Sequence, residues 1–195
     1  MDRRQEVNIE LIDARKKSAK PMLWVSIISM VMFFAGLTSA YVISMRREDW
    51  VSFDLPTSFY TSTVLIILSS ITLIIAQRLL RKNNTKLSIV FLSMTLVLGI
   101  LFVWYQWIGF NELKAVGLYF TGKGSTVSTS FIIGITLMHV LHLAAGIITL
   151  LVVFINHLRN KYSSENMLGF ELGSIFWHFV DILWIYLFFF FYFIR

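Results

Sequence analysis

Two pairs of ionisable side chains lie in otherwise apolar segments and are the residues best placed to do chemistry. His139 and His142 are three residues apart in "MHVLHLAAG", and His178 and Asp181 are three apart in "WHFVD". A separation of three places both members of a pair on one helix face. Glu171 precedes the second pair in "GFELG". A charge at the centre of a bilayer costs at least ~2.5–3.5 kcal/mol, so such side chains are expected to turn inward and find partners.

Three roles fit these side chains. They could form a buried polar seam that fixes how helices pack, they could handle protons or lipid headgroups, or they could ligate a haem or metal. His139 and His142 cannot hold the two axial positions of one haem, because both lie on one helix face. A haem between His139 and His178 would be crowded by three aromatic neighbours, which are Trp177, Phe179 and Trp184.

The composition indicates a membrane protein. Of the 195 residues, 57% are hydrophobic and 14% are charged, and the mean hydropathy is +0.73, whereas soluble domains are usually ~45–50% apolar and ~25% charged. The chain contains no cysteine, which excludes disulfides, thiolate metal sites and a cysteine nucleophile. The net charge of +6 does not indicate nucleic-acid binding, because the charges cluster between apolar runs.

Five apolar runs are long enough to cross a bilayer, which takes ~20 helical residues. They lie at 22–44, 57–77, 87–109, 129–155 and 172–194. The sequence therefore predicts an all-α, polytopic bundle of five transmembrane helices, with a cytoplasmic segment at 1–20 and one membrane domain at 21–195. Pro21 and Pro56 are expected at helix starts. The many hydroxyls of "TSTVLIILSSIT" (61–72) are expected at a helix–helix interface.

The basic residues predict the topology. Twelve of the 17 fall in the N-terminal segment and in the second and fourth connections. The other five are Arg46, Arg47, Lys114, Lys123 and Arg195. By the positive-inside rule the N-terminus is cytoplasmic and the C-terminus is periplasmic. The last two helices then run antiparallel. At ~1.5 Å per residue, Asp181 and His142 should lie ~5 Å apart in depth and could meet.

Taken together, the motifs resemble subunit III of haem–copper terminal oxidases such as cytochrome c oxidase, in the short five-helix bacterial form. The resemblance covers essentially the whole chain from residue 20. It is carried by "GFELGSIFWHFVDILWIYLF" (169–188), "HVLHLAAG" (139–146), "FFAGLTSAY" (33–41) and "LGILFVWYQW" (98–107). The matching family positions are Gly36, Gln106, Gly146, Gly169, Trp177, Phe179, Val180 and Trp184, together with the histidines, Asp181 and Glu171. Met30 stands where many members have an intramembrane glutamate, and longer members have two further N-terminal helices.

This resemblance implies an accessory, non-redox subunit of a proton-pumping oxidase in the bacterial inner membrane, active only as part of the complex. No catalytic residue, cofactor or metal is expected in this chain. Haems and copper are expected in partner subunits, and phospholipid is expected to be bound. The implied partners are subunit I, in direct contact, subunit II, other oxidase subunits and a respiratory supercomplex. The implied roles are to stabilise subunit I, hold lipids, support proton uptake and protect the active site during turnover.

Other functions stay open at this stage. The same subunit could serve a quinol oxidase, and a related accessory protein could serve nitric oxide reductase. A small transporter would be expected to show broken helices or an inverted repeat, and the sequence has neither. A b-type cytochrome would need haem ligands on facing helices.

The topology can be tested directly with reporter fusions. Fusions after Lys82 and after Arg159 should report the cytoplasm, and a fusion at Arg195 should report the periplasm, because five crossings place the termini on opposite sides. A cytoplasmic signal at Arg195 would contradict the number of helices.

Overall fold

In the computed structural model, five α-helices account for nearly all of the described residues, which are 3–48, 50, 55–115, 127–164 and 166–194, with side chains described from residue 14 on, except residue 15. The helices are α1 (Arg3–Ser44), α2 (Thr57–Arg81), α3 (Thr85–Ala115), α4 (Val127–Leu158) and α5 (Leu168–Phe193). Each of these helices is long and apolar enough to cross a membrane. The predicted all-α, five-helix architecture is confirmed.

The bounds of α2 to α5 lie within six residues of the ends of the apolar runs, whereas the start of α1 differs more. This helix begins at Arg3, well before the apolar run, and the part suited to crossing a membrane is Lys16–Ser44. Pro21 lies inside α1 and not at its start, whereas Pro56 directly precedes α2 as expected. The segment before Pro21 is rich in Glu, Arg and Lys, which favour helix, so polarity alone did not mark the beginning of the helix.

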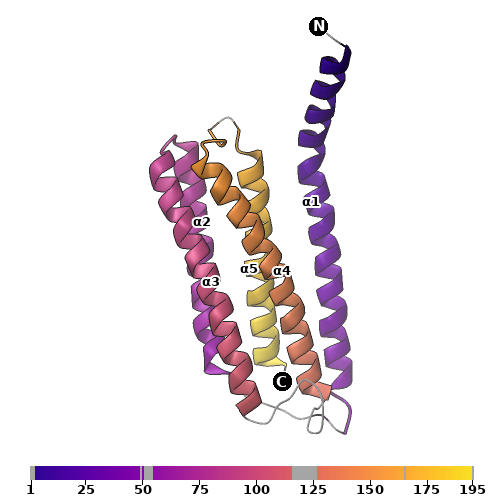
Figure 1. Cartoon of the computed structure of the whole chain (residues 1–195). Coiled ribbons are helices and arrows are strands. Elements are labelled where there is room, and N and C mark those ends of the chain that lie inside the picture. The colour runs from indigo at the N-terminus through magenta and orange to yellow at the C-terminus, as the bar shows by residue number, and fades with distance from the viewer. Residues whose placement is uncertain (1–2, 49, 51–54, 116–126, 165, 195) are drawn as a thin grey trace.

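Consecutive helices alternate in direction, so the two termini lie at opposite ends of the molecule (Figure 1). The α2–α3 and α4–α5 connections lie at the same end. Both turn at an asparagine with positive φ, Asn83 at 58° and Asn160 at 54°. Asparagine tolerates this left-handed conformation better than most residues and commonly ends a helix. Lys123 and Arg195, used above for topology, lie outside the described residues.

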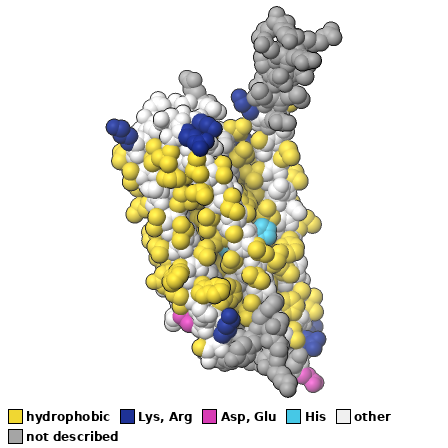
Figure 2. Space-filling model, in the orientation of Figure 1, with side chains coloured by type: hydrophobic (Ala, Val, Ile, Leu, Met, Phe, Trp, Pro, Cys, Tyr) yellow, Lys and Arg dark blue, Asp and Glu magenta, His cyan; other side chains and the backbone are white. Residues whose placement is uncertain are grey.

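Hydrophobic side chains cover the middle of the face shown in Figure 2, and Lys and Arg gather toward its ends. Among the described residues, helix α1 packs on α4 and α5 alone, while α2 packs most closely on α3. Hydroxyl groups join the second pair: Thr72 Oγ1 lies 2.9 Å from Thr95 Oγ1, and Ser88 Oγ donates to the Ala76 carbonyl at 2.9 Å. Five of the six hydroxyl residues of 61–72 contact another helix, as predicted, and Thr61 is exposed.

Trp177 holds the middle of the bundle together. Its indole is fully buried between the backbones of two other helices, at Gly99 of α3 and Gly146 of α4. A Cβ added at Gly99 would lie 2.7 Å from Trp177 Cη2, and one at Gly146 would lie 3.2 Å from Cε3. The indole Nε1 donates to Ser69 Oγ of α2 at 3.1 Å. One side chain of α5 therefore fixes the positions of three neighbouring helices.

Replacing Gly99 with alanine should destabilise the bundle. The added methyl overlaps an indole that is confined on its other side, and overpacking of this kind costs ~1–3 kcal/mol. Gly36→Ala is the matched control, since nothing lies within 4 Å of the Cβ it would add. Loss of helical circular dichroism during titration of the purified chain with sodium dodecyl sulfate measures both. Equal stability of the two variants would show that Trp177 does not pack against Gly99.

Candidate functional site

The interior of the bundle carries a histidine enclosed by aromatic rings. His139 of α4 is fully buried, and its ring centroid lies 5.2 Å from that of Trp184 and 6.3 Å from that of Phe102. Trp184 is itself fixed, because its Nε1 donates to Thr63 Oγ1 at 3.0 Å. Within the described residues, neither ring nitrogen of His139 has a hydrogen-bond partner.

Asp181 lies on the same side of α5 as Trp177 and Trp184, one turn from each. Only 1% of its surface is exposed, and neither carboxyl oxygen has a hydrogen-bond partner among the described residues. Ser70 of α2 lies beside the carboxyl and interacts with it, and the Ser70 hydroxyl also lies 2.6 Å from His178 Nδ1. The buried carboxyl thus has one hydroxyl beside it, which it shares with His178, and no basic side chain bonded to it among the described residues.

The other members of the predicted polar set face different neighbours. His178 Nδ1 lies 2.6 Å from Ser70 Oγ of α2. His142 Nδ1 lies 2.7 Å from the Met138 carbonyl of its own helix, and its ring meets the edge of Phe34 of α1. The two pairs therefore differ: His178 and Asp181 both lie beside Ser70, whereas His139 and His142 have no common partner among the described residues.

Glu171 is at the end of the bundle where the α2–α3 and α4–α5 connections lie. Its carboxylate accepts from Lys20 Nζ of α1 at 2.6 Å and from an Arg81 guanidinium nitrogen of α2 at 3.4 Å. These two ion pairs tie the beginning of α5 to two other helices. Both cations are about half exposed, so the pairs act more on helix position than on stability.

The register of α4 against α5 bears on the expected meeting of Asp181 and His142. Gly146 faces Trp177 and His139 faces Trp184, so antiparallel counting brings Asp181 level with His142. The two side chains are at one depth, yet no hydrogen bond joins them in the described part of the chain. In that same part, no three His, Cys, Asp or Glu side chains are grouped as a metal site requires.

A second fully buried histidine, His157, was not among the predicted site residues. His157 Nε2 lies 3.0 Å from Ser88 Oγ, which in turn donates to the Ala76 carbonyl, so α4 is linked through Ser88 to α2 and α3. Helical periodicity could have identified it. His157 is 18 residues after His139, which is five turns of ~3.6 residues on the same face.

Several positions of the family resemblance have packing roles. Gln106 is buried and donates from Nε2 to Ser62 Oγ at 2.9 Å. Gly146 lies under the Trp177 indole, and a Cβ at Gly169 would lie 2.6 Å from the Tyr162 hydroxyl. Val180 is fully buried, whereas Phe179 is half-buried. Gly36 has open space around it, and nothing in the structure explains why a glycine is there.

Together these features define a class of protein. The described chain is a helical bundle with five helices that can span a membrane, with an apolar exterior and polar side chains held inside by tryptophans and hydroxyls.

The particular family follows from comparison with known proteins. Residues 14–195 match the model of the cytochrome c oxidase subunit III family, and the chain belongs to this family. It is 26% identical over 155 residues to cytochrome c oxidase subunit 3 of Alkalihalophilus pseudofirmus, covering 80% of this chain and 73% of that one. It is 32% identical over 126 residues to the Spodoptera frugiperda protein of the same name, covering 65% and 82%. The match to the Drosophila melanogaster protein, 31% over 172 residues, covers 83% of this chain and 63% of that one.

The structure sets a specific expectation for Asp181. In the polar-seam hypothesis, Asp181→Leu leaves a histidine without its partner. Here no histidine is bonded to the carboxyl among the described residues, and Ser70 beside it keeps its contact with His178. Replacing such a weakly paired buried polar group with an apolar one is neutral or stabilising. Asp181→Leu and Asp181→Asn should therefore both fold with a free energy of unfolding within about 1 kcal/mol of wild type, or above it.

His178→Leu is the matched control, one turn away on α5. It removes the bond to Ser70 and should cost ~0.5–1.5 kcal/mol. The titration with sodium dodecyl sulfate compares all three variants. A loss of more than about 1 kcal/mol in Asp181→Leu alone would mean that a polar partner holds the carboxyl and would restore the seam hypothesis.

Proposed function

We propose that this chain is the accessory, non-redox subunit III of a proton-pumping haem–copper terminal oxidase. The observation that carries the proposal is the family match over residues 14–195, which includes the whole five-helix bundle. The oxidase relatives are named for cytochrome c, so cytochrome c is the proposed electron donor. Haems and copper belong, in this proposal, to subunits I and II.

The outer surface of the bundle supports assembly inside the membrane. Large apolar side chains are exposed along every helix, for example Val25 of α1, Val64 of α2 and Ile182 of α5. A surface of this kind can be covered only by lipid or by other transmembrane helices. Subunit I is the proposed direct partner, and subunit II and the other oxidase subunits complete the complex in a bacterial inner membrane.

The buried polar residues have a proposed role in the complex. His139 and Asp181 occupy the interior without mutual hydrogen bonds, and residues that add little to the stability of a fold are candidates for function. We assign them to the support of proton uptake during turnover and assign Trp177 and its glycines to the fold. The Asp181 variants separate these roles, because their stability is expected to be unchanged.

Deleting this chain should leave a working but short-lived oxidase core. The subunit I–II core should keep its haems and copper, since none of them is assigned here, and much of its initial electron transfer. Activity should then decline in fewer turnovers than in the wild-type complex, because proton delivery and protection of the active site are weakened. Haem spectra, copper content and oxygen consumption followed to inactivation measure these quantities.

Complementation with the wild-type chain is the control and should restore the turnover lifetime. Complementation with Asp181→Asn should restore assembly, and a shortened lifetime with that variant assigns the carboxyl to proton uptake. If deletion abolishes oxygen consumption in a core with normal haem content, the accessory role is wrong and a catalytic role replaces it.

A further inference from the structure

Three polar side chains meet between α2 and α5, near the middle of both helices. Ser70 Oγ of α2 lies 2.6 Å from His178 Nδ1, and the Asp181 carboxyl lies beside the same hydroxyl. Some hydroxyls of α2 donate to their own helix, as Ser62 does to the Phe59 carbonyl. The Ser70 hydroxyl is directed to side chains instead, and it has two neighbours that can accept its one proton.

These side chains connect the interior with the outer surface. Only 1% of the Asp181 surface is exposed, whereas His178 is half-buried. A carboxyl inside a membrane protein exchanges its proton through neighbouring groups that can carry one. An imidazole ring can take up a proton at one nitrogen and release one from the other. His178 can therefore pass a proton between Ser70 and the outside of the bundle.

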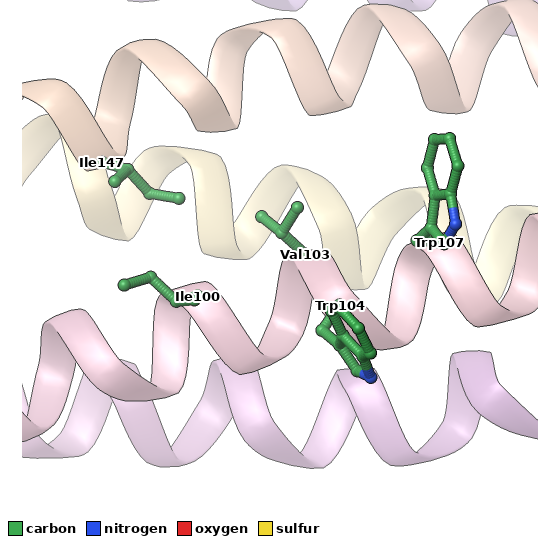
Figure 3. Close-up of a pocket in the computed structure, with 5 residues that line it drawn as sticks. All are labelled: Ile100, Val103, Trp104, Trp107 and Ile147. Carbon is green, nitrogen blue, oxygen red and sulfur yellow. The ribbon is translucent and has the colours of Figure 1, made fainter.

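An apolar groove elsewhere on the outer surface offers no such connection. It lies between α3 and α4, has a volume of about 390 Å³ and is lined by Ile100, Val103, Trp104, Trp107 and Ile147. In Figure 3, Ile147 extends from α4 toward Ile100 at one end, and Trp107 stands at the other. None of these side chain types takes up or releases a proton, so the groove cannot relay one to Asp181.

Few other ionisable groups lie near the three side chains. Helices α1, α2 and α3 contribute none at this depth, since ionisable residues are absent from 22–40, 61–77 and 87–104. Helix α4 contributes two histidines. His142 is level with Asp181, but its Nδ1 donates to the Met138 carbonyl, and His139 lies against Trp184. The charge of Asp181 therefore acts first on the Ser70 hydroxyl.

That charge fixes the direction of the hydrogen bonds. A neutral carboxyl has an O–H group that must find an acceptor when buried, and Ser70 Oγ lies beside it. Ser70 then donates to His178 Nδ1, and the imidazole carries its proton at Nε2. A carboxylate can only accept, so Ser70 must donate to it. His178 Nδ1 must then carry the proton that bonds to Ser70 Oγ.

We propose that Asp181, Ser70 and His178 form a hydrogen-bonded switch, in which the charge of the buried carboxyl decides which ring nitrogen of His178 carries the proton. When Asp181 ionises, its proton moves to Ser70 Oγ, the Ser70 proton moves to Nδ1, and the Nε2 proton leaves. One proton is released in total and no helix has to move. His178 then offers an acceptor at Nε2 in place of a donor.

This inference goes beyond the proposed function, because the switch is a property of this chain alone. It makes the hydrogen-bonding character of a half-buried ring depend on a charge that lies out of reach of the surface. Any molecule that contacts Nε2 of His178 would therefore meet a donor in one state and an acceptor in the other.

Nitrogen NMR of the full-length chain, isotope-labelled at histidine and held in lipid bilayers, tests the proposal. Infrared spectroscopy of the same samples follows the carboxyl band of Asp181, which is identified by its loss in Asp181→Asn. Across the pH range in which this band disappears, the His178 signal should shift from the Nε2–H to the Nδ1–H tautomer. Asp181→Asn should lose the shift, because an amide has no proton to release.

Ser70→Ala removes the hydroxyl that links the two groups. The Asp181 band should still respond to pH in this variant, but the His178 tautomer should no longer follow it. Ser93→Ala is the matched control, since the Ser93 hydroxyl of α3 donates to the Val90 carbonyl of its own helix. It should switch as wild type does. Circular dichroism confirms that both variants keep their helices.

His142 is an internal control in every spectrum. Its Nδ1 faces a carbonyl oxygen, which can only accept, so neutral His142 should keep the Nδ1–H tautomer throughout.

Three results would overturn the proposal. They are a single His178 tautomer at every pH in wild type, an unchanged switch in Ser70→Ala, and a doubly protonated His178 wherever Asp181 is neutral. Because the measurement uses this chain alone, such a failure leaves the accessory function standing. A chain that switches but never joins an oxidase overturns only that function.

Discussion

The bundle depends on the close packing of one indole. Trp177 lies between Gly99 and Gly146 and donates to Ser69, so a single side chain of α5 sets the spacing of α2, α3 and α4. Inside a membrane the hydrophobic effect does not drive helices together, because lipid tails are as apolar as the side chains. Close packing and hydrogen bonds between helices must therefore determine which surfaces meet. Trp177 supplies the packing through its ring on the two glycines and the hydrogen bond through its N–H group. The remaining polar contacts extend this arrangement: Trp184 reaches Thr63, Gln106 reaches Ser62, and His157 reaches Ser88.

Two kinds of polar residue are distinguished by their surroundings. Hydroxyls such as those of Thr72 and Thr95, and the N–H groups of Trp177 and Trp184, are paired across helices, and their loss would loosen the fold. His139 and Asp181 are equally buried but are unpaired among the described residues. A membrane protein that retains such groups accepts a cost in stability. That difference is the physical basis for linking the second kind to function in the complex.

The outer surface also has two kinds of region. Most of it is aliphatic and suited to any lipid or helix, whereas the α3–α4 groove is bordered by two exposed tryptophans and ends at a lysine. At the other end of the bundle, Glu171 pairs with Lys20 of α1 and Arg81 of α2 and so ties both helices to the beginning of α5. Charged side chains thus lie toward the two ends of the molecule. The face shown in Figure 2 has no Lys, Arg, Asp or Glu at mid-depth.

The sequence by itself determined the helices and the family. Apolar length fixes the crossings because the bilayer has a set thickness, and the "WHFVD" segment with its neighbours is specific enough to indicate subunit III. The start of α1 was not determined, since helix propensity extends beyond the apolar run. Only the tertiary structure decided where the polar side chains point. A spacing of three defines a helix face, but the rotation of α5 against α2 and α4 turns His178 to Ser70 and leaves Asp181 beside Trp177 and Trp184. That rotation is set by Trp177 and the two glycines, which lie far apart in the sequence and meet only in the folded bundle.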